Sequence, residues 1–242
     1  MNSARVISEP ARRPSLVLLG LEPWRAAWEL AVNKVTRPNP AVRGDGSPVV
    51  IFPGMATDAR AVAPLRDHCL ALGYSAFDWG RGFNTGPSGD VDQWLAELAR
   101  ETRARIAPFG AKATLIGWSL GGLYARELAK LMPSSVRQVI TIGTPFNADA
   151  DYTNVGWLYE LLNGQPATAP AAMHRRLKQA PNVPTTSIYS RTDGVVAWQT
   201  CKHEAASART QDIEVRSSHL GMGWNRDVLR VVGDCLARPL AR

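Results

Sequence analysis

Residues 113–131 read ATLIGWSLGGLYARELAKL, and this stretch carries the clearest structural pattern of the chain. Its first six residues are an apolar run typical of a buried strand, and apolar side chains recur at helical spacing from Leu120 onward. Between the two lies a G-x-S-x-G pattern, with Gly117 and Gly121 flanking Ser119. In a strand–turn–helix of this kind the serine hydroxyl projects from the sheet, and a Cβ at either glycine collides with the turn. The pattern predicts a nucleophile at Ser119; a purely structural turn is the alternative.

Short apolar strands alternate with helices on both sides of this stretch. The alternation predicts an α/β fold with a mostly parallel sheet of about six strands, flanked by helices on both faces. We expect residues 48–242 to form this domain, with a helical cap insertion at about 146–184, where 39 residues carry no strand signal. Residues 1–47 are expected to be an N-terminal extension with one helix that starts at Pro23. The strands are expected at 48–53, 74–79, 113–118, 136–143, 185–190 and 212–217, and the helices of the domain at about 57–72, capped by Thr57 or Asp58, 91–106, 120–131 and 226–236.

A serine hydroxyl is a weak nucleophile unless a base accepts its proton, and the chain has only four histidines. His68 falls inside an expected helix, and His174 falls in the insertion. His203 follows a short helix and is expected to be solvated. His219 lies in the loop S-S-H-L-G after the last expected strand, at the sheet edge where parallel α/β folds bind their ligands. We therefore expect His219 to be the base; a loop histidine satisfied by backbone groups is the alternative.

The base needs a carboxylate that orients its ring, and Asp193 is the first choice. Asp193 lies in S-R-T-D-G directly after the fifth expected strand, where Gly194 permits a tight turn. Asp149 and Asp151, after the fourth strand, are the rivals, and Asp78 is less favoured because it precedes the serine. The resulting order is Ser119, Asp193, His219: nucleophile, acid, base.

Residues 48–238 resemble the α/β-hydrolase superfamily, in particular its small bacterial lipases and esterases. The resemblance rests on the G-W-S-L-G-G turn, the D-G-V-V loop after the fifth strand and the S-H-L-G segment, and T-I-G-T-P-F at 141–146 is also similar. It implies an α/β-hydrolase fold and an oxyanion hole made by the backbone amides of Leu120 and Met55. The family's usual His-Gly after the first strand reads Pro53-Gly54 in this chain.

Five of the eight tryptophans fall at expected strand ends or in the loops beside them. With nearby apolar residues they predict an acyl-binding pocket under the cap; ordinary packing in the core or the cap is the alternative for each. The residues expected to bind substrate are Trp79, Trp118, Trp157, Leu158 and Trp198, with Met55, Tyr159, Leu161, Leu162 and Trp224 close by and residues 81–87 as a further rim.

The net charge of +7 is spread along the chain and interleaved with acidic residues, which argues against a nucleic-acid partner. No apolar run is long enough for a membrane span, so we expect membrane contact to be at most peripheral, through an amphipathic element within the first 35 residues. Three cysteines make no disulfide framework, no metal-binding spacing is present, and no secretory signal is recognisable, so a cytoplasmic location is expected.

These observations lead us to expect a serine hydrolase that cleaves a small-molecule or lipid-like carboxylic ester through an acyl-enzyme. The chemistry needs no metal or organic cofactor. If the protein is an enzyme, the alternative is that the same three residues carry out a thioesterase, amidase or acyltransferase reaction. The alternative to an enzyme is a non-catalytic ligand-binding protein on the same fold. The sequence does not indicate the oligomeric state.

Overall fold

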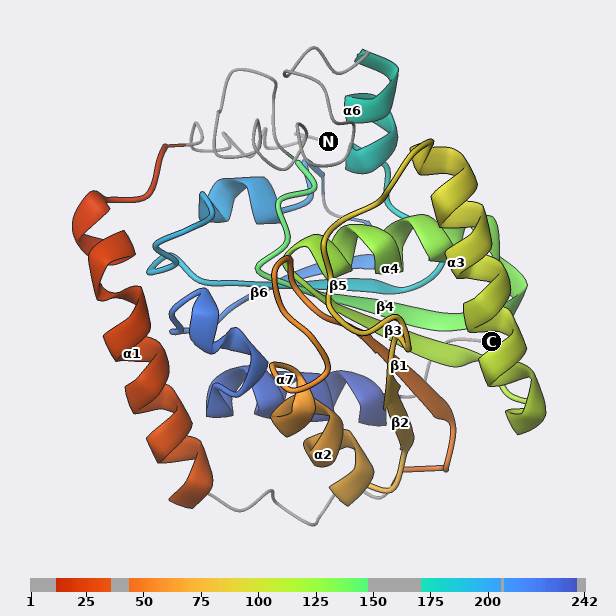
Figure 1. Ribbon diagram of the computed structural model, residues 1–242, viewed down its shortest axis with the longest axis horizontal. Helices are drawn as coiled ribbons and strands as arrows, with labels where there is room; N and C mark the ends of the chain where they lie inside the picture. The colour runs from red at the N-terminus through yellow and green to blue at the C-terminus, as the bar shows by residue number, and fades with distance from the viewer. Residues whose placement is uncertain (1–11, 36–43, 148–170, 206, 239–242) are drawn as a thin grey trace, which may run out of the picture.

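The computed structural model describes residues 12–35, 44–147, 171–205 and 207–238. Six parallel strands form a sheet in the order β2-β1-β3-β4-β5-β6 (Figure 1). This confirms the α/β architecture with about six parallel strands. The strands are β1 (Pro48–Phe52), β2 (Ser75–Asp78), β3 (Ala113–Trp118), β4 (Val136–Ile142), β5 (Thr185–Tyr189) and β6 (Thr210–Glu214).

Helices cover both faces of the sheet because successive side chains of a strand point to opposite faces. Val50 and Phe52 pack toward α3 (Val91–Ile106) and α4 (Leu120–Leu131). Val49 and Ile51 pack toward α2 (Ala63–Ala71) and α7 (Arg226–Ala237). Figure 1 shows the two helix layers on opposite sides of the sheet. The central strands are therefore buried on both faces, and only their ends are left to carry chemistry.

Further helices lie around this core. The long helix α1 (Leu16–Val35) runs along the side of the molecule and packs on α7 and on the short helix η4 (Leu220–Gly223) (Figure 1). Helix α6 (Ala171–Lys178) packs on α4. The remaining one-turn helices are η1 (Ala107–Phe109), η2 (Pro133–Ser135) and η3 (Trp198–Cys201). Most of the predicted cap, residues 148–170, lies outside the described residues, and the division at residue 48 stays a prediction.

Two predicted helix starts are wrong. Helix α1 begins at Leu16, where the Ser15 hydroxyl accepts the amide of Val17, and Pro23 lies inside the helix rather than at its start. A proline inside a helix loses one backbone donor, and Pro23 does so on the solvent side. Helix α2 begins at Ala63 rather than near residue 57. Thr57 donates to the carbonyl of Gly54, and Asp58 pairs with Arg60, so neither side chain caps the helix.

The sixth strand also lies two to three residues earlier than predicted, at Thr210–Glu214 instead of 212–217. It is the edge strand, and its pairing with β5 runs from Thr185–Thr210 to Tyr189–Glu214. All of its positions are half-buried or exposed, so no buried apolar run marked its start.

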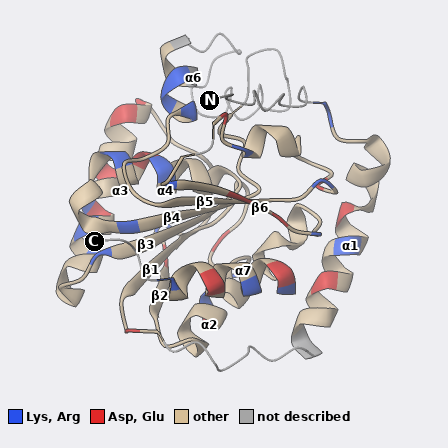
Figure 2. Cartoon of the chain, turned by 180° about the vertical axis from the view of Figure 1, so that it is seen from behind, with Lys and Arg blue, Asp and Glu red and all other residues tan. Residues whose placement is uncertain are grey.

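Acidic and basic side chains are mixed over the helices (Figure 2). Among the described residues, no helix is both long enough and apolar enough to cross a bilayer.

Candidate active site

Ser119 lies in the turn between β3 and α4 in a backbone conformation that non-glycine residues rarely adopt, with φ 52° and ψ −120°. Its amide donates to the carbonyl of Ile142 at 2.8 Å, which ties the turn to β4. A Cβ on Gly117 would lie 2.2 Å from the Gly121 carbonyl oxygen, and one on Gly121 would lie 2.3 Å from that of Phe52. The turn therefore requires both glycines, and it holds Ser119 in a strained, fixed position.

Three side chains from separate strand ends form one chain of hydrogen bonds. The hydroxyl of Ser119 donates to Nε2 of His219 at 3.1 Å, and Nδ1 of His219 donates to Oδ2 of Asp193 at 2.7 Å. Asp193 follows β5, and His219 follows β6 and directly precedes η4. All three residues are less than 10% exposed. The structure thus brings together the three residues expected to be nucleophile, acid and base; their catalytic role stays a prediction.

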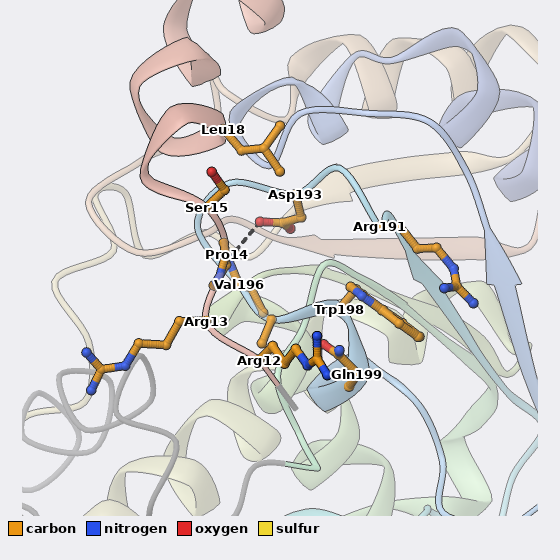
Figure 3. Close-up of a pocket in the computed structure, with 11 residues that line it drawn as sticks. Arg12, Arg13, Pro14, Ser15, Leu18, Arg191, Asp193, Val196, Trp198 and Gln199 are labelled. Carbon is orange, nitrogen blue, oxygen red and sulfur yellow. Dashed lines mark hydrogen bonds between the residues drawn. The ribbon is translucent and has the colours of Figure 1, made fainter. Parts of the chain in front are cut away.

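The second oxygen of Asp193 is also fixed. Oδ1 accepts the amides of Val195 at 2.8 Å and Val196 at 2.7 Å, so the carboxylate is held by its own loop. Figure 3 shows Asp193 beside Val196 and the residues that lead into α1. With Oδ1 engaged by two donors, Oδ2 is left to face the imidazole and hold its Nδ1–H tautomer.

The electrostatics around His219 favour its protonated form. Burial alone would lower the pKa of His219, but the charge of Asp193, the hydrogen bond to it and the charge of Glu22 raise that pKa above its ordinary value. An imidazole of raised pKa is a stronger base for the serine proton once the ring is neutral.

Glu22 on α1 is a site residue that the sequence reasoning missed. Its Oε1 accepts the amide of Gly194 at 2.8 Å, and its Oε2 accepts the amide of Leu220 at 2.9 Å. These are the residues that directly follow Asp193 and His219. Glu22 is only 1% exposed. One buried carboxylate therefore joins the two loops that carry Asp193 and His219.

Glu29, two turns further along α1, makes a second anchor. Its Oε1 accepts the amide of Ser218 at 2.7 Å, and its Oε2 accepts the hydroxyl of Ser217 at 2.9 Å. Glu22 and Glu29 are the only acidic residues of the helix, and a spacing of seven puts both on one face. The seven-residue spacing of the two glutamates was the sequence signal for the contact between α1 and the loops of Asp193 and His219.

The other candidate acids and histidines lie elsewhere or are engaged. The carboxylate of Asp78 accepts the amide of Gly80 at the β2 edge, and Asp149 and Asp151 lie outside the described residues. The expectation that His203 is solvated is wrong, because its side chain is 6% exposed and pairs with Asp212 at 2.7 Å and with Arg126 at 3.2 Å. His68 lies in α2 as expected. Nε2 of His203 faces Arg126 rather than a serine or threonine hydroxyl.

The two amides expected to form the oxyanion hole lie in turns at the ends of neighbouring strands. Leu120 is the first residue of α4, at the positive end of the helix dipole, and half-buried Met55 lies in the turn after β1. Buried Asn84 fixes that turn: its side chain donates to the Pro53 carbonyl at 2.9 Å, and its own carbonyl accepts the amide of Ala56 at 2.8 Å. A role of the two amides in binding an oxyanion stays a prediction.

The residues expected to bind substrate fall in three different environments. Trp79 is buried in the core and stacked on Tyr124, with ring centroids 6.0 Å apart, so its side chain is a packing residue rather than part of a pocket wall. Trp118 is also buried, and its indole N–H donates to the carbonyl of His219 at 3.2 Å, which ties it to the loop that carries His219. Trp198 lines a cavity, whereas Trp157 and Leu158 lie outside the described residues.

The cavity that Trp198 lines has a volume of about 420 Å³ and lies beside Asp193 (Figure 3). Its walls come from the loop after β5 and from the residues before and at the start of α1, including Arg12, Arg13 and Leu18. Within the described part of the chain, no group of three His, Cys, Asp or Glu side chains is placed to hold a metal ion.

Comparisons with known proteins agree with this architecture. The model of the family described as "Alpha/beta hydrolase family" matches residues 49–235. A pimeloyl-[acyl-carrier protein] methyl ester esterase of Shewanella sp. (strain MR-7) is 30% identical over 103 residues, which are 42% of this chain and 36% of that protein. The chain matches less than half the length of its curated relatives.

Solved structures share the fold at low sequence identity. The mature Bacillus licheniformis lipase BlEst2 has a TM-score of 0.60 at 21% identity, covering 84% of this chain and 95% of that one. A thioesterase domain from the curacin biosynthetic pathway has a TM-score of 0.58 at 14% identity, covering 80% and 92%. At these identities the likeness extends to the fold and not to the substrate.

Proposed function

The chain belongs to the alpha/beta hydrolase family, and from this premise we propose that it hydrolyses carboxylic esters through a covalent intermediate on Ser119. The observation that carries the proposal is the hydrogen-bonded chain from Ser119 through His219 to Asp193. It supplies a nucleophile, a base within reach of its proton, and a carboxylate that orients the base. The esterases among the curated relatives support the same choice.

The first half of the proposed reaction acylates the serine. As Nε2 of His219 accepts the hydroxyl proton, Oγ of Ser119 bonds to the ester carbonyl carbon and the carbonyl oxygen becomes an oxyanion. The tetrahedral intermediate then expels the alkoxide, which takes the proton back from His219 and leaves as the alcohol. Asp193 stays ionised throughout and stabilises the imidazolium.

The second half releases the acid. His219 accepts a proton from water as the water oxygen attacks the acyl carbon, and the proton returns to Oγ of Ser119 when the acyl bond breaks. In both halves the amides of Leu120 and Met55 are proposed to donate to the oxyanion. Such preorganised donors typically contribute about 3 kcal/mol each to transition-state stabilisation.

The ester is proposed to be a small or lipid-like molecule whose acyl group binds beside Trp198. The test is turnover of matched ester, thioester and amide substrates over a series of acyl chain lengths, together with labelling by a fluorophosphonate probe. We expect the ester to have the highest kcat/KM and Ser119 to carry the label. A folded protein that is not labelled and turns over none of the three would overturn the proposal. Faster turnover of the thioester would reassign the substrate class.

The raised pKa of His219 predicts the pH dependence of the reaction. The base works only when neutral, so kcat/KM should fall as the pH drops through the pKa of His219 in the free enzyme. Because that pKa is raised, the acidic limb should lie above about pH 6.5, the ordinary value for histidine. The measurement is kcat/KM between mildly acidic and mildly basic pH. A limb well below the ordinary value would contradict the charge arrangement described above.

A further inference from the structure

Two carboxylates of helix α1 bind the loops that carry Asp193 and His219, and Glu22 makes the contact nearest the reacting groups. The side chain of Glu22 spans from Gly194 to Leu220, which are 26 residues apart in the sequence. Arg25, one turn on, approaches Glu22 at 3.6 Å and donates to the carbonyl of Thr192, so the contact also involves the residue before Asp193. The loop of Asp193 and the loop of His219 are thus both hydrogen-bonded to the side chain of Glu22.

We propose that Glu22 is a positioning residue for the hydrolysis: by accepting both amides, it keeps Asp193 and His219 at hydrogen-bonding distance. The proposal rests on the proposed function. Without this acceptor the backbone amides of Gly194 and Leu220 lose their partner, and the loops must rearrange to recover hydrogen bonds. A misplacement of a reacting group by about 1 Å can cost about a hundredfold in rate, so a smaller shift of these loops is expected to cost about tenfold.

The charge of Glu22 offers a readout that a merely structural role would not move. The charged groups facing His219 are Asp193 from the loop after β5 and Glu22 from α1, with Glu29 beyond it against Ser217 and Ser218. Loss of the Glu22 charge removes one of the influences that raise the pKa of His219. The acidic limb of kcat/KM should then move to lower pH.

The experiment compares wild type, Glu22→Gln and Glu22→Asp. In Glu22→Gln, an NH₂ group faces one of the two amides, so we expect kcat to fall by about tenfold, with KM changed less and the acidic limb at lower pH. Glu22→Asp keeps the charge, so its limb should stay near that of wild type. The matched control is Glu127→Gln, which removes another buried carboxylate, one paired with Lys130 and Arg176 on α4 and α6. It should leave the limb in place even if it lowers stability.

The outcomes separate this proposal from the proposed function. Wild-type kcat and an unmoved limb in folded Glu22→Gln would overturn the positioning role while leaving the hydrolysis intact. Absence of turnover in wild type would instead overturn the hydrolysis. If Glu22→Gln does not fold, Glu22→Asp decides: reduced kcat with the wild-type limb supports the role, and loss of folding in both variants makes Glu22 structural and overturns it.

The opposite face of α1 carries a second, independent inference. Every exposed residue from Leu16 to Ala31 is uncharged. The tryptophans Trp24 and Trp28 are 77% and 71% exposed, and the large aliphatic residues on this face are Leu16, Val17, Leu19 and Leu21. Exposed apolar surface of this extent on one element marks an interaction site rather than ordinary surface.

Basic residues border this face at both ends. Exposed Arg12 and Arg13 precede the helix. Near its other end, exposed Arg216 and Arg226 share with Trp28 a cavity of about 440 Å³. The whole chain carries a net charge of +7. Figure 1 shows α1 at the side of the molecule, with its length open to the surroundings. An uncharged helix face with indoles and an arginine border complements the surface of a bilayer that contains anionic lipid.

We propose that the outer face of α1 docks on an anionic lipid surface and lies in the plane of the interface. The apolar side chains would enter the boundary between headgroups and acyl chains, and the arginines would approach the lipid phosphates. Indole rings favour this depth because they are apolar with one polar N–H. Docking would leave the inner face, with Glu22 and Glu29, on the loops described above.

The test measures binding to vesicles of phosphatidylcholine mixed with phosphatidylglycerol and to vesicles of phosphatidylcholine alone. We expect binding to the anionic vesicles that weakens with salt, and about tenfold weaker binding for the double variant Trp24→Gln, Trp28→Gln. Phe109→Gln, which removes an exposed aromatic after α3, is the control and should bind as wild type. The proposal would be overturned if wild type bound both kinds of vesicle with equal affinity. It would also be overturned if wild type and the double variant bound the anionic vesicles equally well. A dimer in light scattering that the double variant abolishes would overturn it too, since a second copy would then cover this face.

Discussion

Ser119→Ala is expected to lower kcat for ester hydrolysis by about ten-thousand-fold or more, to the level that binding and oxyanion stabilisation alone provide. The alanine removes the atom that bonds to the acyl carbon, and no other hydroxyl is hydrogen-bonded to His219 within the described residues. The measurement is steady-state turnover of the best ester substrate. The fluorophosphonate label should disappear in the same variant.

The stability of the variant separates chemistry from folding. Alanine keeps the Cβ, so the strained backbone at φ 52° is retained. The only side-chain hydrogen bond that is lost is the one between Oγ of Ser119 and Nε2 of His219. We expect the free energy of unfolding to change by no more than about 1 kcal/mol. Activity within tenfold of wild type, in protein of unchanged stability, would show that the reaction does not pass through Ser119.

Asp193→Asn is expected to lower kcat by about ten-thousand-fold as well, although the side chain keeps its shape. If the Asn oxygen keeps the amides of Val195 and Val196, its NH₂ group faces Nδ1 of His219. The imidazole must then accept at Nδ1 and carry its proton on Nε2, and in that tautomer it does not accept the proton of Ser119. The measurement is kcat at a pH where the wild-type base is neutral.

The molecule supplies a matched control for this variant. Asp212 pairs with His203 at the same 2.7 Å separation, so Asp212→Asn changes a buried His–Asp pair away from the serine. We expect it to retain kcat within a few-fold. Asp149→Asn and Asp151→Asn test the rival acids and should also stay active. If either of them abolished turnover while Asp193→Asn did not, the acid would have to be reassigned.

The region around Ser119 could be predicted to the residue because all of its determinants are local. β3 and α4 have the bounds that their apolar patterns indicated, and the two glycines that mark the turn are the ones the backbone requires. Asp193 and His219 were predictable for a related reason: in a parallel sheet, loops after different strands end at one edge.

What could not be predicted depends on partners distant in the sequence. Glu22 bonds residues 172 and 198 positions away, and nothing in the composition of α1 names them. His203 was predicted wrongly because its partners, Arg126 and Asp212, come from helix α4 and from the strand whose predicted bounds were themselves wrong. Trp79 looked like a pocket residue by its position at a strand end, but its stacking on Tyr124 places it in the core.

The cavity beside Asp193 has a practical consequence for work with the purified protein. Arg12, Arg13, Pro14 and Ser15 form part of its wall, so substitutions at these positions change the space next to Asp193. Replacing both arginines by glutamine would remove two positive charges from this wall without touching the loop itself. Kinetic constants of such a variant, compared with those of wild type over a range of salt concentrations, would measure how strongly the two arginines act on a charged substrate.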